Sequence, residues 1–166
     1  MDRSKLADLS EIISSIAIFA TLIYLTVEIR QNTLAVQTQT AQAVLQAGQT
    51  ELAMIVENPE IALSIPKSGP LTSEQNVILD AYFASNMRNR EFAWVQYKNG
   101  TIGDVIWDSE ITVLRVQLDS YRFREWWNKL GRHYVGQEYA NFVDKLVDEG
   151  PATDRFWSGA LDWSSE

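Results

Sequence analysis

The stretch "EIISSIAIFATLIYLTVEIR", residues 11–30, decides how the chain folds and where it resides. Sixteen consecutive residues, Ile12 to Val27, carry no charge and lie between Glu11 and Glu28. In a helix they cover about 24 Å, which is short of the roughly 30 Å hydrocarbon core of a bilayer. The length alone therefore permits either a membrane span or the buried helix of a soluble domain.

The flanks of this run favour an uncleaved membrane anchor over residues 1–30. Leu9 and Ile29 extend its apolar length, and the glutamates at its two edges can reach the headgroup region. A cleaved signal peptide is disfavoured because Asp2 and Asp8 precede the run, where positive charge is expected, and no small-residue cleavage site follows it. The buried helix of a soluble domain stays open as the alternative.

One face of the same helix is built from small residues. Ser14, Ala17 and Thr21 lie at helical spacing, and Glu28 lies at the end of that face. Small residues let membrane helices approach closely, and hydroxyl groups can bond across the contact. We expect this face to bind another membrane helix, from a second copy or from a partner; the alternative is that the hydroxyls bond their own backbone.

After residue 30 the composition changes to a stretch rich in Gln, Ala and Thr that contains no charge until Glu51. Its apolar residues recur at heptad spacing, which predicts a long amphipathic helix. Packing on its own domain is favoured, with an oligomeric coiled coil as the alternative. One row of the predicted stripe is Leu34, Ala41, Gly48 and Ile55, and the next is Leu45 and Leu52.

The remaining chain predicts a helical bundle over residues 31–150, and the whole protein is predicted to be all-α. Three prolines mark a loop over residues 57–74, and a helix follows up to Lys98. "DVIWDSEITVLRVQLDS" fits a helix or a strand; the helix is favoured because no second clear strand is present. Two short helices follow, separated near Gly136. The expected buried residues are Ile78, Tyr82, Met87, Phe92, Trp94, Tyr97, Trp107, Ile111, Leu114, Leu118, Phe123, Trp126, Trp127, Leu130, Tyr139, Phe142, Val143 and Leu146.

Composition excludes several functions. The net charge is −8 and the 14 basic residues are scattered among 22 acidic ones, which argues against a nucleic-acid partner. Without cysteine and with His133 as the single histidine, no metal, cofactor or nucleophile motif is found. An enzyme that uses only carboxylates, such as Glu91 or Glu125 beside aromatic rings, is a third-ranked alternative; ion pairs with neighbouring arginines are favoured for both.

Four tryptophans are candidate partner contacts. Trp126 and Trp127 lie in one short helix, and Trp157 and Trp163 lie in the tail, residues 151–166. Tryptophan is enriched where proteins contact one another. The tail rings are expected to fold back onto the helix of the tryptophan pair, with a partner or the membrane interface as the alternative.

Two stretches carry a resemblance to known proteins. "YLTVEIRQNT" resembles a Y-L-x-x-[EQ]-I-R-Q-N-T signature, and "FREWWNKLGRHYVGQEYANFVDKL" resembles a later W-W and F-x-x-[FY]-V pattern. Both are similar to a family of small membrane-anchored helical proteins of bacteria whose function is unknown. The resemblance implies a membrane anchor and brings no catalytic residues. Related proteins often have more arginines after the signature than this chain has.

Together these features predict a non-enzymatic accessory or scaffold subunit of a membrane complex. We expect a single pass through a bacterial inner membrane, in contact with lipid and with another membrane protein or its own copy. Arg3 and Lys5 precede the run and Arg30 follows it, so the basic residues favour a periplasmic C-terminal domain by one charge. The alternative is a homo-oligomeric pore or sensor with Ser14, Thr21 and Glu28 turned inward.

Overall fold

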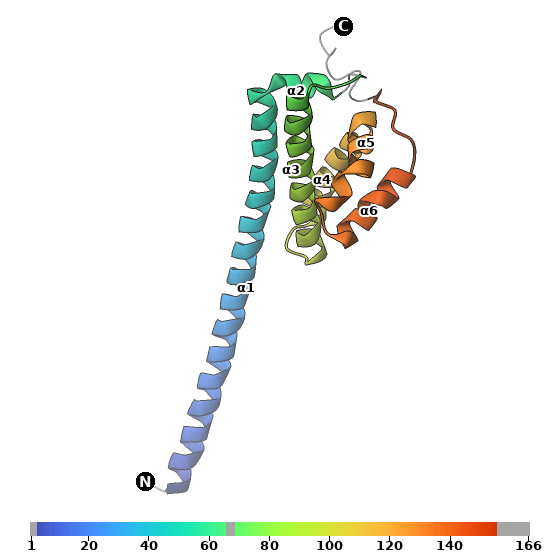
Figure 1. Cartoon of the computed structure of the whole chain (residues 1–166). Helices are drawn as coiled ribbons and strands as arrows, with labels where there is room; N and C mark the ends of the chain where they lie inside the picture. Colours follow the sequence, from blue (N-terminus) through green and yellow to red (C-terminus); the bar gives the residue numbers. More distant parts are fainter. Residues whose placement is uncertain (1–2, 66–68, 156–166) are drawn as a thin grey trace, which may run out of the picture. The chain divides into compact units, whose positions relative to one another are not determined.

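A computed structural model describes residues 3–65 and 69–155 (Figure 1). Every regular element in this part of the chain is helical, which confirms the predicted all-α fold. The elements are α1 (Arg3–Glu57), α2 (Pro59–Ser64), α3 (Ser73–Lys98), α4 (Asp104–Leu118), α5 (Tyr121–Lys129), the short 3₁₀ helix η1 (Gly131–His133) and α6 (Gln137–Asp148).

The chain divides into two compact units, Met1–Gln39 and Thr40–Glu166. The described part of the first unit is the apolar segment of α1 and the turns that follow it. The second unit contains the last turns of α1 and all the later helices. The apolar run thus ends near residue 30, whereas the packed unit begins at Thr40.

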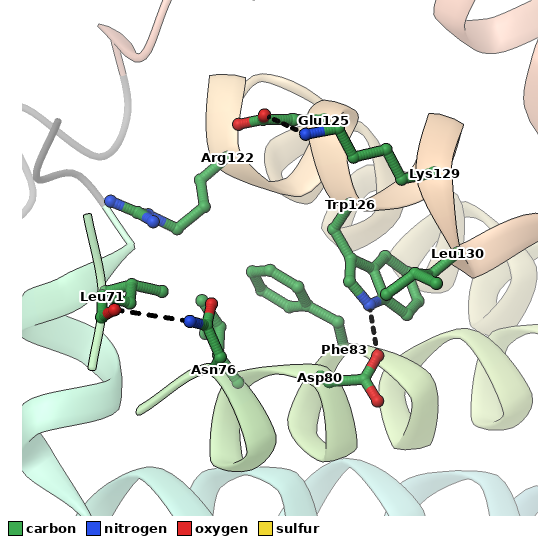
Figure 2. A pocket seen from close by; sticks show the side chains of 10 residues that line it. Leu71, Asn76, Asp80, Phe83, Arg122, Glu125, Trp126, Lys129 and Leu130 are labelled. Atoms are coloured by element: carbon green, nitrogen blue, oxygen red, sulfur yellow. Dashed lines mark hydrogen bonds and ion pairs between the residues drawn. The ribbon is translucent and has the colours of Figure 1, made fainter. Parts of the chain in front are cut away.

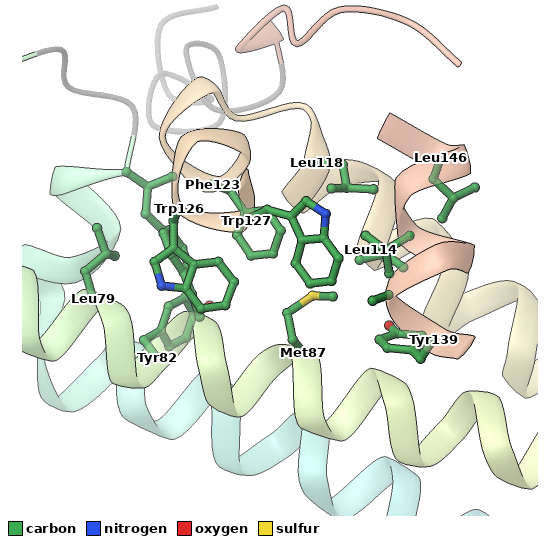
Figure 3. Close-up of a cluster of buried hydrophobic side chains, with 14 residues drawn as sticks. Leu79, Tyr82, Met87, Leu114, Leu118, Phe123, Trp126, Trp127, Tyr139 and Leu146 are labelled. Carbon is green, nitrogen blue, oxygen red and sulfur yellow. The ribbon is translucent and has the colours of Figure 1, made fainter. Parts of the chain in front are cut away.

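The core of the second unit is aromatic and lies on one side of α3 (Figure 3). Phe83 and Met87 on α3 meet Phe123 and Trp127 on α5, and the rings of Phe83 and Phe123 are 4.8 Å apart, edge to face. Such ring pairs add about 0.5–1.5 kcal/mol beyond the area that they bury. The buried members of the cluster are Ile65, Leu79, Tyr82, Phe83, Met87, Leu114, Leu118, Phe123, Trp126, Trp127, Tyr139, Ala140, Val143 and Leu146.

Local signals fix where the helices begin. The side chain of Thr72 accepts a hydrogen bond from the backbone N–H of Gln75, and the Gln75 side chain accepts one from the backbone of Thr72. This capping box satisfies two of the free N–H groups at the start of α3. At the start of α5 the Ser120 hydroxyl oxygen accepts one hydrogen bond, from the backbone N–H of Phe123.

Two element predictions can be compared directly with the structure. The ambiguous run after Gly103 is the helix α4, as favoured. The predicted loop between α1 and α3 was wrong in part, because α2 begins at Pro59 within it. Proline is tolerated at the first helical position, where its missing N–H would have no partner anyway.

The buried stripe of α1 was predicted wrongly in part. Ala41, Gly48 and Ile55 of the first predicted row are partly buried, and Ile55 packs against the core cluster, whereas Leu34 is exposed. Val44 and Glu51 are the buried residues of its last turns, whereas Leu45 and Leu52 are 59% and 65% exposed. In α3 and after α5, Phe92 and Leu130 are also exposed rather than buried. The other residues expected to be buried are buried or partly buried.

Candidate functional site

The predicted helix-packing face lies on the exposed apolar segment of α1. Ser14, Ala17, Thr21 and Glu28 are all exposed. The Ser14 hydroxyl donates to the carbonyl of Ser10, and the Thr21 hydroxyl donates to the carbonyl of Ala17, each over 2.8 Å. Both hydroxyl protons are thus satisfied within the helix, which is the alternative that the sequence left open. The hydroxyl oxygens still have lone pairs that a neighbouring helix could use.

The large apolar side chains of this segment are uncovered. Ile12, Ile16, Phe19 and Ile23 are between 57% and 70% exposed. The helix is long and apolar enough to cross a membrane, and none of its most apolar window is buried. An isolated exposed leucine or isoleucine on a protein needs no explanation, but a large uncovered apolar surface marks a site of contact with another protein or with a membrane.

The two tryptophans of α5 have different surroundings. Trp127 is completely buried, and its indole N–H donates to Asp144 over 3.1 Å. Direct contact between Trp127 and a partner was therefore a wrong expectation, since no part of its ring reaches the surface. Trp126 is 8% exposed and lies at the edge of a groove. Trp157 and Trp163 lie outside the described residues.

A groove of about 340 Å³ opens between α3 and α5 beside Trp126 (Figure 2). Asp80 holds its aromatic wall in place, because its two carboxylate oxygens accept from the Trp126 indole over 2.6 Å and from the Tyr134 hydroxyl over 2.7 Å. Phe83 also lines the groove, and Arg122 lies at the end of the groove away from Trp126. The groove is large enough for a small apolar group.

A cluster of buried charges joins three helices in the second unit. Arg90 on α3 lies between two carboxylates: its Nη2 is 2.9 Å from Glu51 on α1, and its Nη1 is 2.8 Å from Glu110 on α4. The three side chains are between 5% and 11% exposed. Asn89 donates a further hydrogen bond of 2.7 Å to Glu51. We call Glu51, Arg90 and Glu110 the buried triad.

The buried triad holds one more carboxylate than it has cations. Burial raises the pKa of Glu51, against the opposing effect of Arg90. Burial likewise raises the pKa of Glu110, and the charge of Glu51 raises it further. Two ionised carboxylates and one guanidinium would leave a net negative charge away from water, which is unfavourable, so the site favours retaining a proton.

A row of buried polar groups extends from the triad. Gln117 on α4 donates to the side-chain oxygen of Asn86, and the Asn86 amide donates to the carbonyl of Tyr82 over 2.9 Å. Burial raises the pKa of Tyr82 to about 12, and burial also raises the pKa of Tyr139. Gln117 and Asn86 bond each other in the interior, whereas the buried Tyr139 hydroxyl has no hydrogen-bond partner among the described residues. None of these side chains lines the grooves found there.

The two carboxylates considered for catalysis are both held by other groups. Glu91 pairs with Arg88 over 2.7 Å and accepts from the backbone of Gly136, also over 2.7 Å. Glu125 pairs with Lys129, whose hydrogen bond lowers the pKa of Glu125. Ion pairing was favoured for both, although the partner of Glu125 is a lysine instead of an arginine. No group of three metal-ligating side chains occurs within residues 3–65 and 69–155.

The sequence patterns did not reveal the buried triad. Glu51 follows a polar run, and neither Glu51 nor Glu110 was among the residues expected to be buried. A signal was present, because Arg90 lies three residues after Met87 and Glu110 lies four before Leu114. Charges at those positions fall on the apolar stripe of their helices, where they require a partner.

Comparisons with protein families, curated proteins and solved structures give no match to this chain. The resemblance of its two signature stretches to membrane-anchored bacterial proteins therefore stays a prediction.

Proposed function

We propose that the chain is a membrane-anchored accessory or scaffold protein without an enzymatic reaction of its own, and that it binds another membrane protein in a bacterial inner membrane. The observation that carries the proposal is the uncovered apolar segment of α1, residues 8–29. Within the uncharged run, Ile12 to Val27, lipid would cover this surface without leaving a hydroxyl proton of serine or threonine unpaired, because Ser14, Ser15, Thr21 and Thr26 donate to the carbonyls one turn before them.

The small-residue face supports the idea of a helix partner. Around Ala17 the helix presents Ser14 and Thr21. Ile, Leu and Phe predominate on its other sides, with Ser15 and Thr26 on the side opposite Ala17. In lipid the apolar sides gain nothing by meeting one another, and close packing of backbones over small residues provides the attraction. The second unit then serves as the extramembrane domain, on the periplasmic side if the excess of one N-terminal basic residue decides orientation.

The anchor is tested by separating membranes from soluble protein and washing them with alkaline carbonate. The unaltered chain should stay in the pellet. Phe19→Arg places a charge at the centre of the run and costs about 2.5–3.5 kcal/mol on insertion, so more protein should appear in the supernatant. Val105→Arg changes an equally apolar residue, 86% exposed on α4, and should leave the distribution unchanged. Soluble unaltered protein would overturn the proposal.

Orientation and partner are tested separately. Because the chain has no cysteine, Val105→Cys supplies a single label site; a membrane-impermeant maleimide should label it in intact spheroplasts if the domain is periplasmic. Ala17→Leu should reduce the recovery of co-purifying membrane proteins in mild detergent, whereas Ile16→Leu on the adjacent side should not. A ring of one chain, without foreign subunits, would favour the pore or sensor instead.

A further inference from the structure

The last turns of α1 carry two separate apolar faces. One contains Val44 and packs against Ala93 and Ile102 of the bundle. The other contains Leu45, Leu52 and Val56, which are 59%, 65% and 78% exposed. At 100° per residue the second face lies about 80–120° around the helix from Val44. The protein's own bundle therefore leaves the leucine face of α1 uncovered.

The uncovered face has the spacing of a coiled-coil seam. Gln42, Leu45, Gln49, Leu52 and Val56 are separated by alternating steps of three and four residues, and all five are exposed. The two leucines alternate with the two glutamines along this row. A second helix could thus seat its own leucines against Leu45 and Leu52. We call these five residues the α1 seam.

The neighbours of the seam indicate which helix would cover it. Residues 31–50 contain no charged side chain, although the whole chain has a net charge of −8. A foreign helix is usually selected by complementary charges beside the seam, and this stretch offers none. In a parallel pair of identical chains every residue meets its own copy, so a charge there would be repelled by itself.

Glutamines take the place of those charges. Gln42 and Gln49 are exposed members of the seam. A side-chain amide both donates and accepts, so two copies of one glutamine can bond each other, which two copies of a lysine or glutamate cannot. A neutral, amide-containing seam is therefore self-complementary.

We infer that the α1 seam is the contact of a parallel homodimer, in which a second copy of this chain covers Leu45 and Leu52. The seam within the second unit runs for about 15 residues, which is short for a stable coiled coil of free chains. The dimer therefore rests on the proposed membrane anchor, since two chains anchored in one membrane share one direction and have a high effective concentration.

Cysteine cross-linking in native membranes tests the contact, because the chain contains no other cysteine. Leu45→Cys and Leu52→Cys should give a disulfide-linked dimer under mild oxidation. Gln46→Cys and Ala53→Cys are matched controls, exposed at the same levels of α1 but about 80–100° further around it. The seam positions should cross-link several-fold more than the controls, since a disulfide requires Cβ atoms about 3.5–4.5 Å apart.

A second measurement tests the same contact without cysteine substitutions. The full chain in lipid nanodiscs should have the mass of two copies by native mass spectrometry, and the double variant Leu45→Ala with Leu52→Ala should have the mass of one copy. Tryptophan fluorescence would verify that the bundle remains folded. Equal cross-linking at all four positions, or a monomeric unaltered chain, would overturn the dimer while leaving the anchor proposal intact. Release from carbonate-washed membranes with cross-linking preserved would overturn the anchor alone.

Discussion

The guanidinium of Arg90 on α3 lies 2.9 Å from the carboxylate of Glu51 on α1, and only 5% and 7% of the two side chains are exposed. On its other side the same guanidinium meets Glu110 of α4. One arginine thus connects three helices in the interior. A buried charge is tolerated when its partners are in place and becomes costly when one is removed.

Arg90→Met should destabilise the second unit strongly. It removes the cation and leaves two buried carboxylates without a counter-charge, at a cost of about 3–5 kcal/mol. Urea unfolding in mild detergent, followed by tryptophan fluorescence, measures the change. Arg88→Met is the matched control. Arg88 is exposed where it pairs with Glu91, so this ion pair should contribute about 0–1 kcal/mol to stability. Equal losses in the two variants would show that the triad contributes no more than a surface pair.

The stability of the second unit should depend on pH through the same site. The folded state raises the pKa of Glu51 and Glu110, chiefly through burial, so it binds protons more tightly than the unfolded chain does. As pH rises from the ordinary carboxylate value, about 4.3, through the raised pKa, stability is therefore lost. The loss is complete above the raised pKa.

Glu110→Gln isolates this contribution. The variant leaves one carboxylate opposite one guanidinium, so its free energy of unfolding should vary less between pH 5 and pH 8 than that of the unaltered chain. At pH 8 the variant should be nearly as stable as the unaltered chain or more stable. Urea titrations at several pH values provide the comparison, and parallel pH profiles would contradict an extra proton in the triad.

Gly131→Ala should destabilise the turn after α5. A Cβ at this position would lie 2.5 Å from a ring atom of Trp126 and 2.8 Å from one of Trp127. Rings packed in a core cannot move aside freely, so we expect a loss of about 1–3 kcal/mol. Gly150→Ala, where an added Cβ meets nothing within 4 Å, is the control and should change stability by less than about 0.5 kcal/mol. A thermal melt of each variant measures the difference.

Asp80→Ala should loosen the wall of the groove beside α5. It removes both hydrogen bonds that hold Trp126 and Tyr134. Hydrogen bonds to a charged group are worth about 1.5–3 kcal/mol, so stability should fall by an amount in that range. The tryptophan emission should shift as the Trp126 indole loses its carboxylate partner. Tyr134→Phe removes one of the two bonds and should have a smaller effect on both readings.

The sequence predicts helices better than it predicts which helical face is buried. α3, α4, α5 and α6 occur where periodicity, caps and glycines placed them. In α1 the predicted stripe included Leu45 and Leu52, yet the bundle packs against the face of Val44 and Glu51. Periodicity identifies an apolar row but does not say whether the protein's own core or another surface covers it.

Tertiary partners explain the remaining differences. Leu130 continues the apolar spacing of α5, but that helix ends at Lys129 and the chain turns through η1, so the side chain leaves the core. The triad depends on residues 20 to 59 positions apart in the sequence, which no local pattern connects. The four proposed contacts on the apolar segment of α1 could be named because helical spacing alone defines a face there.

The chain order of the triad has a consequence during synthesis. Glu51 is made 39 residues before Arg90. At about 5–20 residues per second the ribosome needs about 2–8 s to add that stretch. Throughout this interval the last turns of α1 carry an ionised carboxylate and an open apolar flank, with the bundle that will enclose them not yet translated. An anchor segment at residues 8–29 would reach the bilayer in the same interval, so membrane insertion would come first and closure of the bundle around Glu51 would follow.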